Sequence, residues 1–442
     1  MTDGQRVLAA LAELPGGPEL LAAGERRRDA ALVGGAVRDL LLDAAPRELD
    51  VVLDGEVEPL ARELAGDLGA EVAVHERFGT ALVEWDRGRI DLARRRAERY
   101  PGPGALPEVR PGSAAEDLAR RDFTVNAIAL HLGGQDRGAL QGAEHALADL
   151  AAHRLRVLHR RSFLDDPTRL LRLARYRARL GFEVEPGTAQ LARAAVQTGA
   201  LATVTPARIG AELRLALGEE DPAAALEAAG ELGLLAALHP RLRFDGELAR
   251  DALALLAPAA PAPTVQPVCA GGARPARERP PRPGLLALAV LIQSLAGEAA
   301  APDEDRARAL LDELEIPAGE RDGALVAARA APALAERLAG AHSASQLQRA
   351  VRDATLEAVA LAGAWARRRP GHARAREQAA RWLDGLHAVR LQIGGEDLLA
   401  AGVPEGPEVG RRLQAALAAK LDGSLDGRGR EAELRAALEA SV

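Results

Sequence analysis

The sequence predicts an α+β protein, in which a small mixed α/β head with an antiparallel sheet precedes an all-helical neck, body and tail. Up to about residue 150, short runs of β-forming residues alternate with segments of helical periodicity, which is typical of an α/β or α+β domain. Beyond that point, Leu-, Ala- and Arg-rich helical patterns continue to the C-terminus, interrupted by glycine and proline. Because 442 residues exceed one ordinary core, we expect roughly two to four domains.

The individual elements follow from the same patterns. Residues 5–23 are predicted to be a short helical lead-in, and residues 58–68 a helix of the head. The strands expected in the head are residues 30–33, 49–53, 80–85 and 128–132. The expected domains are a head over 1–148, a helical neck over 149–220, a helical body over 221–300, and a helical body and tail over 301–442.

Composition excludes several classes of protein. The single cysteine, Cys269, excludes a disulfide framework and a multi-cysteine zinc site. No apolar stretch is long enough to span a bilayer and no signal-peptide pattern opens the chain, so we expect a cytoplasmic protein without membrane association. Residues 258–284, rich in Pro, Ala and Arg, are predicted to be a flexible insertion. Nothing in the sequence implies a protein partner.

The net charge of −7 argues mildly against nucleic-acid binding when the chain is taken as a whole. Its distribution reverses this argument, because residues 151–215 contain 12 arginines and only 5 acidic residues. A local basic stretch on an acidic body can be a phosphate-binding surface. Charge alone favours the simpler interpretation, which is a solvated helical face.

A glycine pair ends the first expected strand of the head. Gly34 and Gly35 follow a short apolar run, and a helix is expected to begin at once. Glycines let a phosphate approach the backbone, and a helix N-terminus supplies N–H donors and a favourable dipole. Arg38 then lies in the first turn of that helix, where it could contact a triphosphate oxygen. A Gly-Gly turn alone is more often a tight strand–helix connection.

Three carboxylates lie on neighbouring predicted strands. Glu48 and Asp50 are two residues apart, so their side chains are expected to project from one strand face. Asp91 lies in a run expected to pair with residues 80–85 across a turn at residues 86–88. Such ligands suit Mg²⁺, and two ions could activate an attacking hydroxyl and stabilise a leaving pyrophosphate. An isolated Glu-x-Asp would more often be solvated or salt-bridged.

A third segment places two adjacent arginines before polar residues within an apolar frame. It reads Arg120-Arg121-Asp122-Phe123-Thr124-Val125-Asn126. These residue types suit phosphate and ribose contacts. A charged turn that leads into a buried strand would show the same pattern.

A fourth segment predicts a helix that begins near Asp165, with Asp165 as its N-cap and Pro167 in its first turn. The residues that share one face, at about 100° per residue, are Asp165, Arg169, Arg172, Tyr176 and Arg179, with Asp166 at the margin. A helix face that offers both hydrogen-bond donors and hydrogen-bond acceptors suits the recognition of a nucleotide base. An amphipathic helix with ion pairs worth about 0.3–0.5 kcal/mol each explains the same pattern.

Together, the order and spacing of these motifs resemble a known family. Gly34-Gly35, followed thirteen residues later by Glu48-x-Asp50, resembles the nucleotidyltransferase signature of the polymerase β superfamily. Residues 120–127 and 165–169 are similar to motifs of class II tRNA nucleotidyltransferases (CCA-adding enzymes) and bacterial poly(A) polymerases. Residues 393–398 and 402–407 are similar to the tail motif of bacterial tRNA nucleotidyltransferases.

The resemblance implies an activity and a role for each matching residue. It implies template-independent addition of CMP, AMP or both to the 3′ end of tRNA, from CTP and ATP, with Mg²⁺ as cofactor and release of pyrophosphate. The implied catalytic carboxylates are Glu48, Asp50 and Asp91, of which Glu48 and Asp50 would bind the metal. In the family, the residues that match Asp166 and Arg169 select the base. The implied nucleotide-binding residues are Gly34, Gly35, Arg38, Arg121, Asp122, Asn126, Asp166, Arg169, Arg172 and Arg175.

One departure and two alternatives accompany this interpretation. The family usually has Asp where this chain has Glu48, and the extra methylene shifts the carboxylate, so Asp50 is the stronger metal candidate. A bacterial poly(A) polymerase is the first alternative, but the basic run usual in those enzymes is missing from residues 75–80. A non-catalytic RNA-binding protein with a degenerate head is the second, and the intact carboxylate set argues against it.

Overall fold

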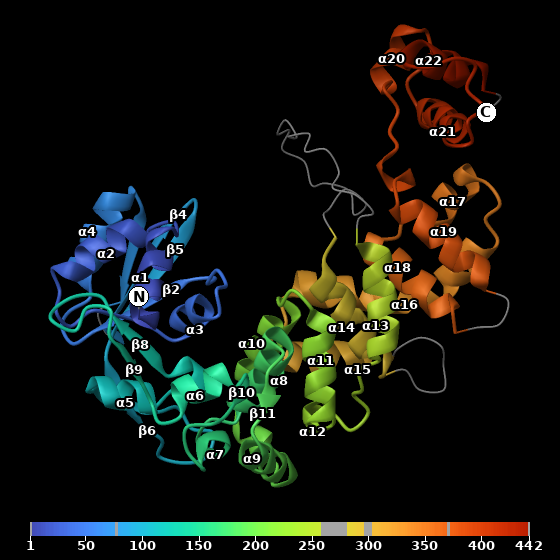
Figure 1. Cartoon of the computed structure of the whole chain (residues 1–442). Helices are drawn as coiled ribbons and strands as arrows, with labels where there is room; N and C mark the ends of the chain where they lie inside the picture. Colours follow the sequence, from blue (N-terminus) through green and yellow to red (C-terminus); the bar gives the residue numbers. More distant parts are fainter. Residues whose placement is uncertain (1, 76–77, 258–280, 296–302, 369–371, 441–442) are drawn as a thin grey trace. The chain divides into compact units, whose positions relative to one another are not determined.

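The structure is a computed structural model that describes residues 2–75, 78–257, 281–295, 303–368 and 372–440. The chain forms two compact units (Figure 1). Their bounds are Met1–Ile209 with Glu231–Ala237 for the first unit, and Gly210–Gly230 with Leu238–Val442 for the second. The predicted boundary between head and neck at residue 148 lies within the first unit, so that subdivision stays a prediction.

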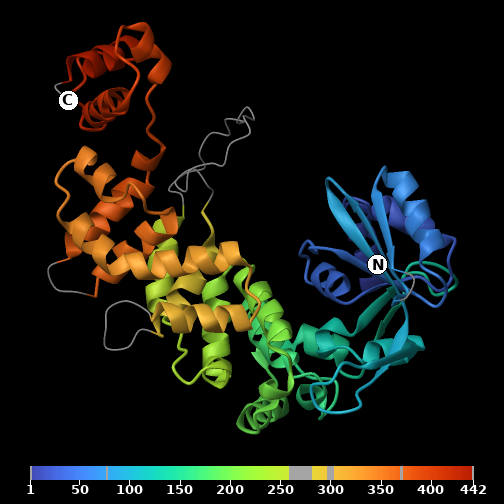
Figure 2. The ribbon, with the colours of Figure 1, turned by 180° about the vertical axis from the view of Figure 1, so that it is seen from behind.

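The head is built on one seven-stranded sheet with the strand order β3-β4-β5-β2-β1-β8-β9, seen from both sides in Figure 1 and Figure 2. Among the described strands of this sheet, β2 and β5 run parallel and all other neighbours are antiparallel. The predicted, mainly antiparallel sheet is therefore confirmed. Its strands are β1 (Ala31–Val33), β2 (Leu49–Leu53), β3 (Glu71–His75), β4 (Thr80–Trp85), β5 (Gly88–Arg94), β8 (Ile128–His131) and β9 (Leu140–Gly142).

The core of the head lies around the central strands. All three residues of β1 are buried, as expected for an apolar strand in the middle of a covered sheet. Val33, Val52 and Ala129 belong to one buried cluster. The predicted lead-in consists of two helices rather than one, because Gly16 has a φ of 78° and interrupts them. The helices before residue 70 are α1 (Asp3–Ala12), α2 (Gly17–Glu25), α3 (Gly35–Leu41) and α4 (Glu58–Leu68).

The rest of the first unit is mostly helical, with two short additional sheets. A parallel pair, β10 and β11, departs from the predicted all-helical neck. The antiparallel hairpin β6–β7 is not among the strands predicted from the sequence. The elements are β6 (Arg96–Arg99), β7 (Glu108–Pro111), α5 (Ala114–Ala119), η2 (Thr124–Asn126), α6 (Ala146–Ala151), β10 (Arg154–Leu155), α7 (Ser162–Asp165), α8 (Thr168–Leu180), β11 (Glu183–Val184), α9 (Pro186–Gln197), η3 (Ala200–Thr203) and the start of α10 (Pro206–Leu217).

The described part of the second unit contains helices and no strand, which confirms the predicted helical body and tail. None of the described helices is long and apolar enough to cross a membrane. The predicted insertion 258–284 lies outside the described residues except for residues 281–284. The helices from residue 222 onward are α11 (Pro222–Glu231), α12 (Leu234–Leu238), α13 (Gly246–Leu256), α14 (Pro283–Gln293), α15 (Glu304–Glu313), α16 (Ala318–Ala339), α17 (Ala344–Ala350), α18 (Leu356–Ala366), α19 (Ala373–Leu383), η5 (Leu386–Ala388), α20 (Gly395–Ala400), α21 (Pro407–Leu421) and α22 (Arg430–Glu439).

The C-terminal helices have a small core of their own. Ile393, Leu398 and Val403 pack with Ala416 and Ala437 in one buried cluster. The first three residues belong to the two segments that resemble a family tail motif. The apolar positions of that motif therefore hold α20, α21 and α22 together.

Candidate active site

Two carboxylates lie side by side at the centre of the head sheet. In the parallel register of β2 and β5, Asp50 is the partner of Asp91. Glu48 lies one residue before β2, and its carboxylate forms an ion pair with Arg89. Nε of Arg89 also lies 3.1 Å from Oδ2 of Asp91. The structure therefore brings the three predicted carboxylates together around one arginine.

Burial and like charge raise the pKa of both central carboxyls. Burial is the largest cause that raises the pKa of Asp50 to about 6, the charge of Glu48 adds to it, and Arg121 opposes it. Burial also raises the pKa of Asp91, against the charge of Arg89. Positive charge at this site would favour the ionised form of both groups.

These two carboxyls fit a divalent cation. Oδ2 of Asp91 is buried and has no hydrogen bond within the described structure, although Arg89 lies close to it. Mg²⁺ is usually held by one or two carboxylates together with substrate phosphates, and Asp50 with Asp91 supplies two. Among the described residues, no group of three His, Cys, Asp or Glu is arranged to hold a metal. The ligand role of Glu48, which is paired with Arg89, stays a prediction.

The glycine turn brings an arginine close to the backbone. Gly34 follows β1 as the N-cap of α3, with φ 72° and ψ −133°, a conformation that is essentially restricted to glycine. A Cβ atom at this position would lie 2.6 Å from an amino nitrogen of Arg121. Arg121 binds Asp117 at 3.2 Å, and its buried Nε has no hydrogen-bond partner in the described structure. Because Arg121 also acts electrostatically on Asp50, it is available to an anion beside the carboxylates.

Arg38 lies beneath this turn in a buried network. Its side chain is 1% exposed and donates hydrogen bonds to Oδ1 of Asp39 and to Oδ1 of Asn126. Nδ2 of Asn126 donates to Asp122 at 2.9 Å, and Nε of Arg172 donates to the same carboxylate at 2.8 Å. These bonds make Arg38 a support of the site, and its predicted contact with triphosphate stays a prediction.

Asp122 is the ionised centre of that network. Burial acts to raise its pKa, but the charge of Arg172 and the hydrogen bonds from Asn126 and Arg172 outweigh burial and hold the pKa well below its usual range. Asp122 therefore stays charged and fixes Arg172, which belongs to α8, against the head. This ion pair connects two of the motifs found in the sequence.

An aromatic ring organises the arginines of α8. The guanidinium carbons of Arg38, Arg172 and Arg175 lie 5.3, 5.8 and 4.9 Å from the ring centroid of Tyr176, which are cation–π distances. The ring also meets Phe123 edge to face, with centroids 5.8 Å apart. The structure thus places the predicted nucleotide-binding residues Arg172 and Arg175 at one aromatic centre.

The predicted start of the base-reading helix, with Asp165 as N-cap, is wrong by two residues. α8 begins at Thr168 with Pro167 as its N-cap, and Asp165 ends the short helix α7. The cause is Pro167, which disfavours helical geometry in the residue before it; Asp166 accordingly has φ −133° and ψ 92°. Asp166 therefore lies in the break between α7 and α8.

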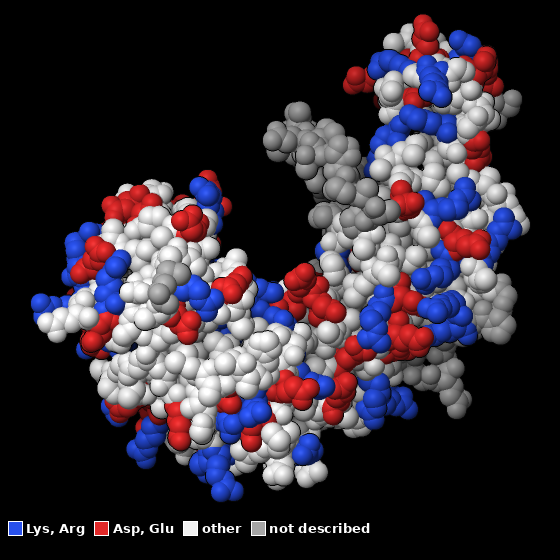
Figure 3. All heavy atoms as spheres, viewed as in Figure 1, with Lys and Arg blue, Asp and Glu red and all other residues white. Residues whose placement is uncertain are grey.

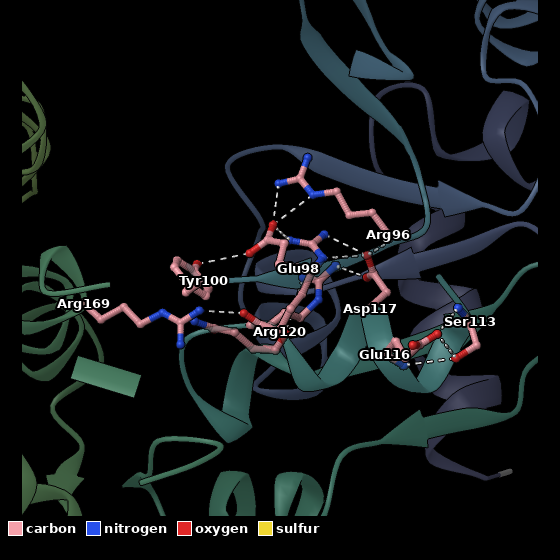
Figure 4. Close-up of polar contacts among 10 residues, drawn as sticks. Arg96, Glu98, Tyr100, Ser113, Glu116, Asp117, Arg120 and Arg169 are labelled. Carbon is pink, nitrogen blue, oxygen red and sulfur yellow. Dashed lines mark hydrogen bonds and ion pairs between the residues drawn. The ribbon is translucent and has the colours of Figure 1, made fainter. Parts of the chain in front are cut away.

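Both Asp166 and Arg169 form side-chain hydrogen bonds with residues of other elements: Asp166 accepts and Arg169 donates. Arg169 is 4% exposed and donates to Oγ of Ser162 at 2.7 Å. It also donates to the carbonyl oxygen of Arg120 at 2.6 Å (Figure 4). Oδ1 of Asp166 accepts from Thr168 and from Arg208. The polar edge of α8 is thus packed against the head rather than solvated, and its base-reading role stays a prediction.

The two adjacent arginines of the third motif have different environments. Arg120 is bound by Asp117 at 2.7 Å and by Glu98 at 3.1 Å, and Glu98 also accepts from Arg96 and Tyr100 (Figure 4). Arg120 is therefore a structural link between α5 and β6. Of the two, Arg121 has a buried donor without a partner, which suits the nucleotide-binding role that the resemblance implies for it.

The basic stretch 151–215 is not a free positive surface. Several of its arginines are paired with carboxylates, including Arg156 with Asp149 and Arg177 with Glu231. On the face shown in Figure 3, basic and acidic side chains are interspersed. For these residues, the simpler interpretation of a charge-paired surface is the better description.

Sequence reasoning missed four supporting residues of the site. Their partners are distant in sequence or lie in segments for which no element was predicted, so only the three-dimensional structure connects them. The sequence offered two signals that could have indicated such residues: the aromatic side chain of Tyr100, and an arginine, Arg208, near the start of α10. The four are Glu98, Tyr100, Asp117 and Arg208.

Comparison with known proteins gives matches over the part of the chain that contains this site. Residues 30–156 match the family described as "Poly A polymerase head domain", and residues 181–245 match "Probable RNA and SrmB- binding site of polymerase A". Over its N-terminal half, the chain is therefore similar to poly(A) polymerases and tRNA nucleotidyltransferases. The family predicted from the sequence is thereby confirmed.

Individual relatives agree with this assignment. The A-adding tRNA nucleotidyltransferase of Halalkalibacterium halodurans is 41% identical over 219 residues, 49% of this chain and 51% of the relative. The CC-adding tRNA nucleotidyltransferase of Deinococcus radiodurans is 44% identical over 193 residues, 43% of this chain and 50% of the relative. The chain thus spans about half the length of these two relatives.

A solved structure extends the similarity over the rest of the chain. The Thermotoga maritima CCA-adding enzyme complexed with tRNA-CCA has a TM-score of 0.67 and 25% identity. The match covers 99% of this chain and 98% of that chain. The predicted fold class, an α/β head followed by a helical remainder, is confirmed by this comparison.

Proposed function

We propose that this chain is a tRNA nucleotidyltransferase that adds CMP, AMP or both to the 3′ end of tRNA, from CTP and ATP, and releases pyrophosphate. The observation that carries the proposal is the pairing of Asp50 with Asp91 in the register of β2 and β5, within a head of the matching family. We place the reaction in the cytoplasm, as predicted from the sequence.

The chemistry is a phosphoryl transfer. The terminal 3′-hydroxyl oxygen of tRNA forms a bond to the α-phosphorus of the nucleotide, and the bond to pyrophosphate breaks. Asp50 and Asp91 would hold Mg²⁺, which, when bound, assists ionisation of the hydroxyl and neutralises charge on the leaving pyrophosphate. Arg121, beside the glycine turn, has the unpaired buried Nε–H that suits a phosphate oxygen.

Base choice follows from the chemistry of Asp166. Cytosine and adenine carry an exocyclic amino group where uracil and guanine carry a carbonyl oxygen. A carboxylate oxygen accepts a hydrogen bond from an amino group and repels a carbonyl. Asp166 therefore favours CTP and ATP, and Arg169 adds N–H donors for the ring nitrogen or carbonyl of the same bases.

The test is transfer of a single labelled nucleotide. CTP, ATP, UTP and GTP, each labelled at the α-phosphate, are offered separately, with Mg²⁺, to transcripts of tRNA that lack the last one, two or three nucleotides. The proposal expects CMP or AMP to be incorporated and UMP and GMP to be largely rejected. An unrelated RNA of equal length is the control substrate.

The outcomes separate the candidate functions. Incorporation of CMP or AMP into truncated tRNA, but not into the unrelated RNA, supports the proposal. Long AMP tracts on both RNAs would identify a poly(A) polymerase instead. Binding of tRNA without any incorporation would identify a non-catalytic RNA-binding protein.

A further inference from the structure

We infer that Arg208 is a positioning residue that sets nucleotide selectivity, because it holds the carboxylate of Asp166 in the orientation that reads a base. This inference rests on the proposed function, in which Asp166 and Arg169 select CTP and ATP. The two amino nitrogens of Arg208 have separate partners: one donates to Oδ1 of Asp166 at 2.8 Å, and the other to the carbonyl oxygen of Gly104 at 2.9 Å.

Arg208 fixes one oxygen of Asp166 and leaves the other available. Oδ1 also accepts from Oγ1 of Thr168 at 2.6 Å and from its backbone N–H at 3.2 Å. Within the described structure, no residue donates a hydrogen bond to Oδ2. The carboxylate thus has one saturated oxygen and one that can accept from the amino group of a base.

Without Arg208, the orientation of this carboxylate would be poorly defined. Asp166 lies in the break between α7 and α8, and both remaining donors belong to Thr168, two residues away. The plane of the carboxylate could then turn about the terminal side-chain bond of Asp166, because that torsion is broad. Among the described residues, Arg208 supplies the only side-chain hydrogen bond to the Asp166 carboxylate from outside α7 and α8.

The second partner of Arg208 is itself rigidly held. Gly104 has a φ of 69°, and a Cβ atom there would lie 2.2 Å from Oγ1 of Thr203. Its N–H donates to the carbonyl oxygen of Leu164 at 3.1 Å. The loop between β6 and β7 is therefore packed on η3 and α7. Arg208 joins this loop to Asp166 with one planar group, which suits two separate acceptors.

The place of Arg208 in its own helix supports a specific role. It is the third residue of α10, which begins at Pro206. The helix dipole disfavours a positive charge in the first turn, so helix stability does not account for an arginine there. Its side chain is 26% exposed and that of Asp166 is 19% exposed, so a substrate base can reach the pair.

The experiment compares nucleotide selectivity in Arg208→Ala, Arg208→Lys and a control, Arg214→Ala. Arg214 lies six residues further along α10, is 47% exposed, and pairs at the surface with Glu320. For each protein, kcat/KM on truncated tRNA is measured with CTP, ATP, UTP and GTP. The same four nucleotides are titrated calorimetrically with Mg²⁺, so that selectivity in binding is known even without turnover.

Arg208→Ala should lower the preference for CTP or ATP over UTP and GTP by roughly tenfold or more. Arg208→Lys, which keeps the charge but cannot fork to both acceptors, should fall between Arg208→Ala and the wild type. Arg214→Ala should keep the wild-type ratios. A purely structural role predicts a different result, since partial unfolding lowers all four kcat/KM values by one common factor.

A double variant tests whether Arg208 acts through Asp166. If it does, Asp166→Ala with Arg208→Ala should be no less selective than Asp166→Ala alone. Unchanged ratios in Arg208→Ala, or fully additive losses in the double variant, would overturn the inference. If Arg208→Ala does not fold, the Arg208→Lys ratios decide in the same way. Absence of any transfer by the wild type overturns the proposed function instead, and the binding ratios then still test Arg208.

Discussion

Replacement of Gly34 by alanine should damage both the stability of the head and nucleotide transfer. Gly34 has φ 72° and ψ −133°, where a residue other than glycine costs about 1–3 kcal/mol. A Cβ atom would also lie 2.6 Å from an amino nitrogen of Arg121, so that side chain must move away from the turn. If Arg121 binds phosphate through a charge-assisted hydrogen bond, its loss costs a further 1.5–3 kcal/mol, or about 10- to 150-fold in kcat/KM.

Gly35→Ala is the matched control for strain. Gly35 begins α3, and a Cβ atom added there would have Arg38 as its nearest neighbour, at 3.5 Å, an ordinary contact distance. Thermal unfolding should show a fall of about 2–12 °C for Gly34→Ala, since 1 kcal/mol corresponds to about 2–4 °C in a unit of this size. Gly35→Ala should change the midpoint little. Wild-type stability together with wild-type kcat/KM in Gly34→Ala would refute this account of the turn.

Three further predictions concern the carboxylates and the base-reading helix. Asp50→Ala should abolish nucleotide addition but leave tRNA affinity, measured by filter binding, nearly intact, because the metal acts on the transition state; activity near that of the wild type would remove Asp50 from this role. The pKa of Asp50 is raised from 3.8 to about 6 in the folded protein, so ionisation of this carboxyl lowers the free energy of unfolding of the metal-free protein. This loss of stability is absent below about pH 4 and is complete above about pH 6. Metal-free Asp50→Asn should therefore be more stable than the wild type at pH 7.5, by up to about 2–3 kcal/mol, and the difference in denaturation midpoint should close toward pH 4; a constant difference contradicts the assignment. Arg169→Ala should lose discrimination among the four nucleotides more than it loses transfer rate, whereas an equal fall in all four kcat/KM values would make Arg169 a phosphate or structural residue.

The sequence predicted best those elements whose structure depends on residues close together in the chain. The strands around Asp50 and Asp91 were predicted because apolar alternation and a short turn specify β4 and β5 without long-range information. The strands β7 and β3 were missed, since all four residues of β7 are exposed and β3 has no buried residue. Such edge elements lack the apolar signal on which prediction depends.

The supporting contacts of the site could not be predicted from spacing. Arg38 was expected at a triphosphate because it lies just after two glycines, yet its hydrogen bond to Asn126 joins residues 88 positions apart. Arg208 and Asp166 are 42 positions apart. Which arginine meets which carboxylate depends on tertiary packing, and the sequence offers many arginines of equal local character.

The most direct test of the central claim is single-turnover transfer by the wild type and Asp50→Asn with saturating Mg²⁺. The substrate is tRNA that lacks its 3′-terminal nucleotides, and the product is identified by sequencing its 3′ end. The structure predicts added C, A or both with the wild type, and a rate lower by several orders of magnitude with Asp50→Asn at similar tRNA affinity. Equal rates for the two proteins, or no addition by the wild type, would contradict the assignment of Asp50 and Asp91 as the centre of a tRNA nucleotidyltransferase.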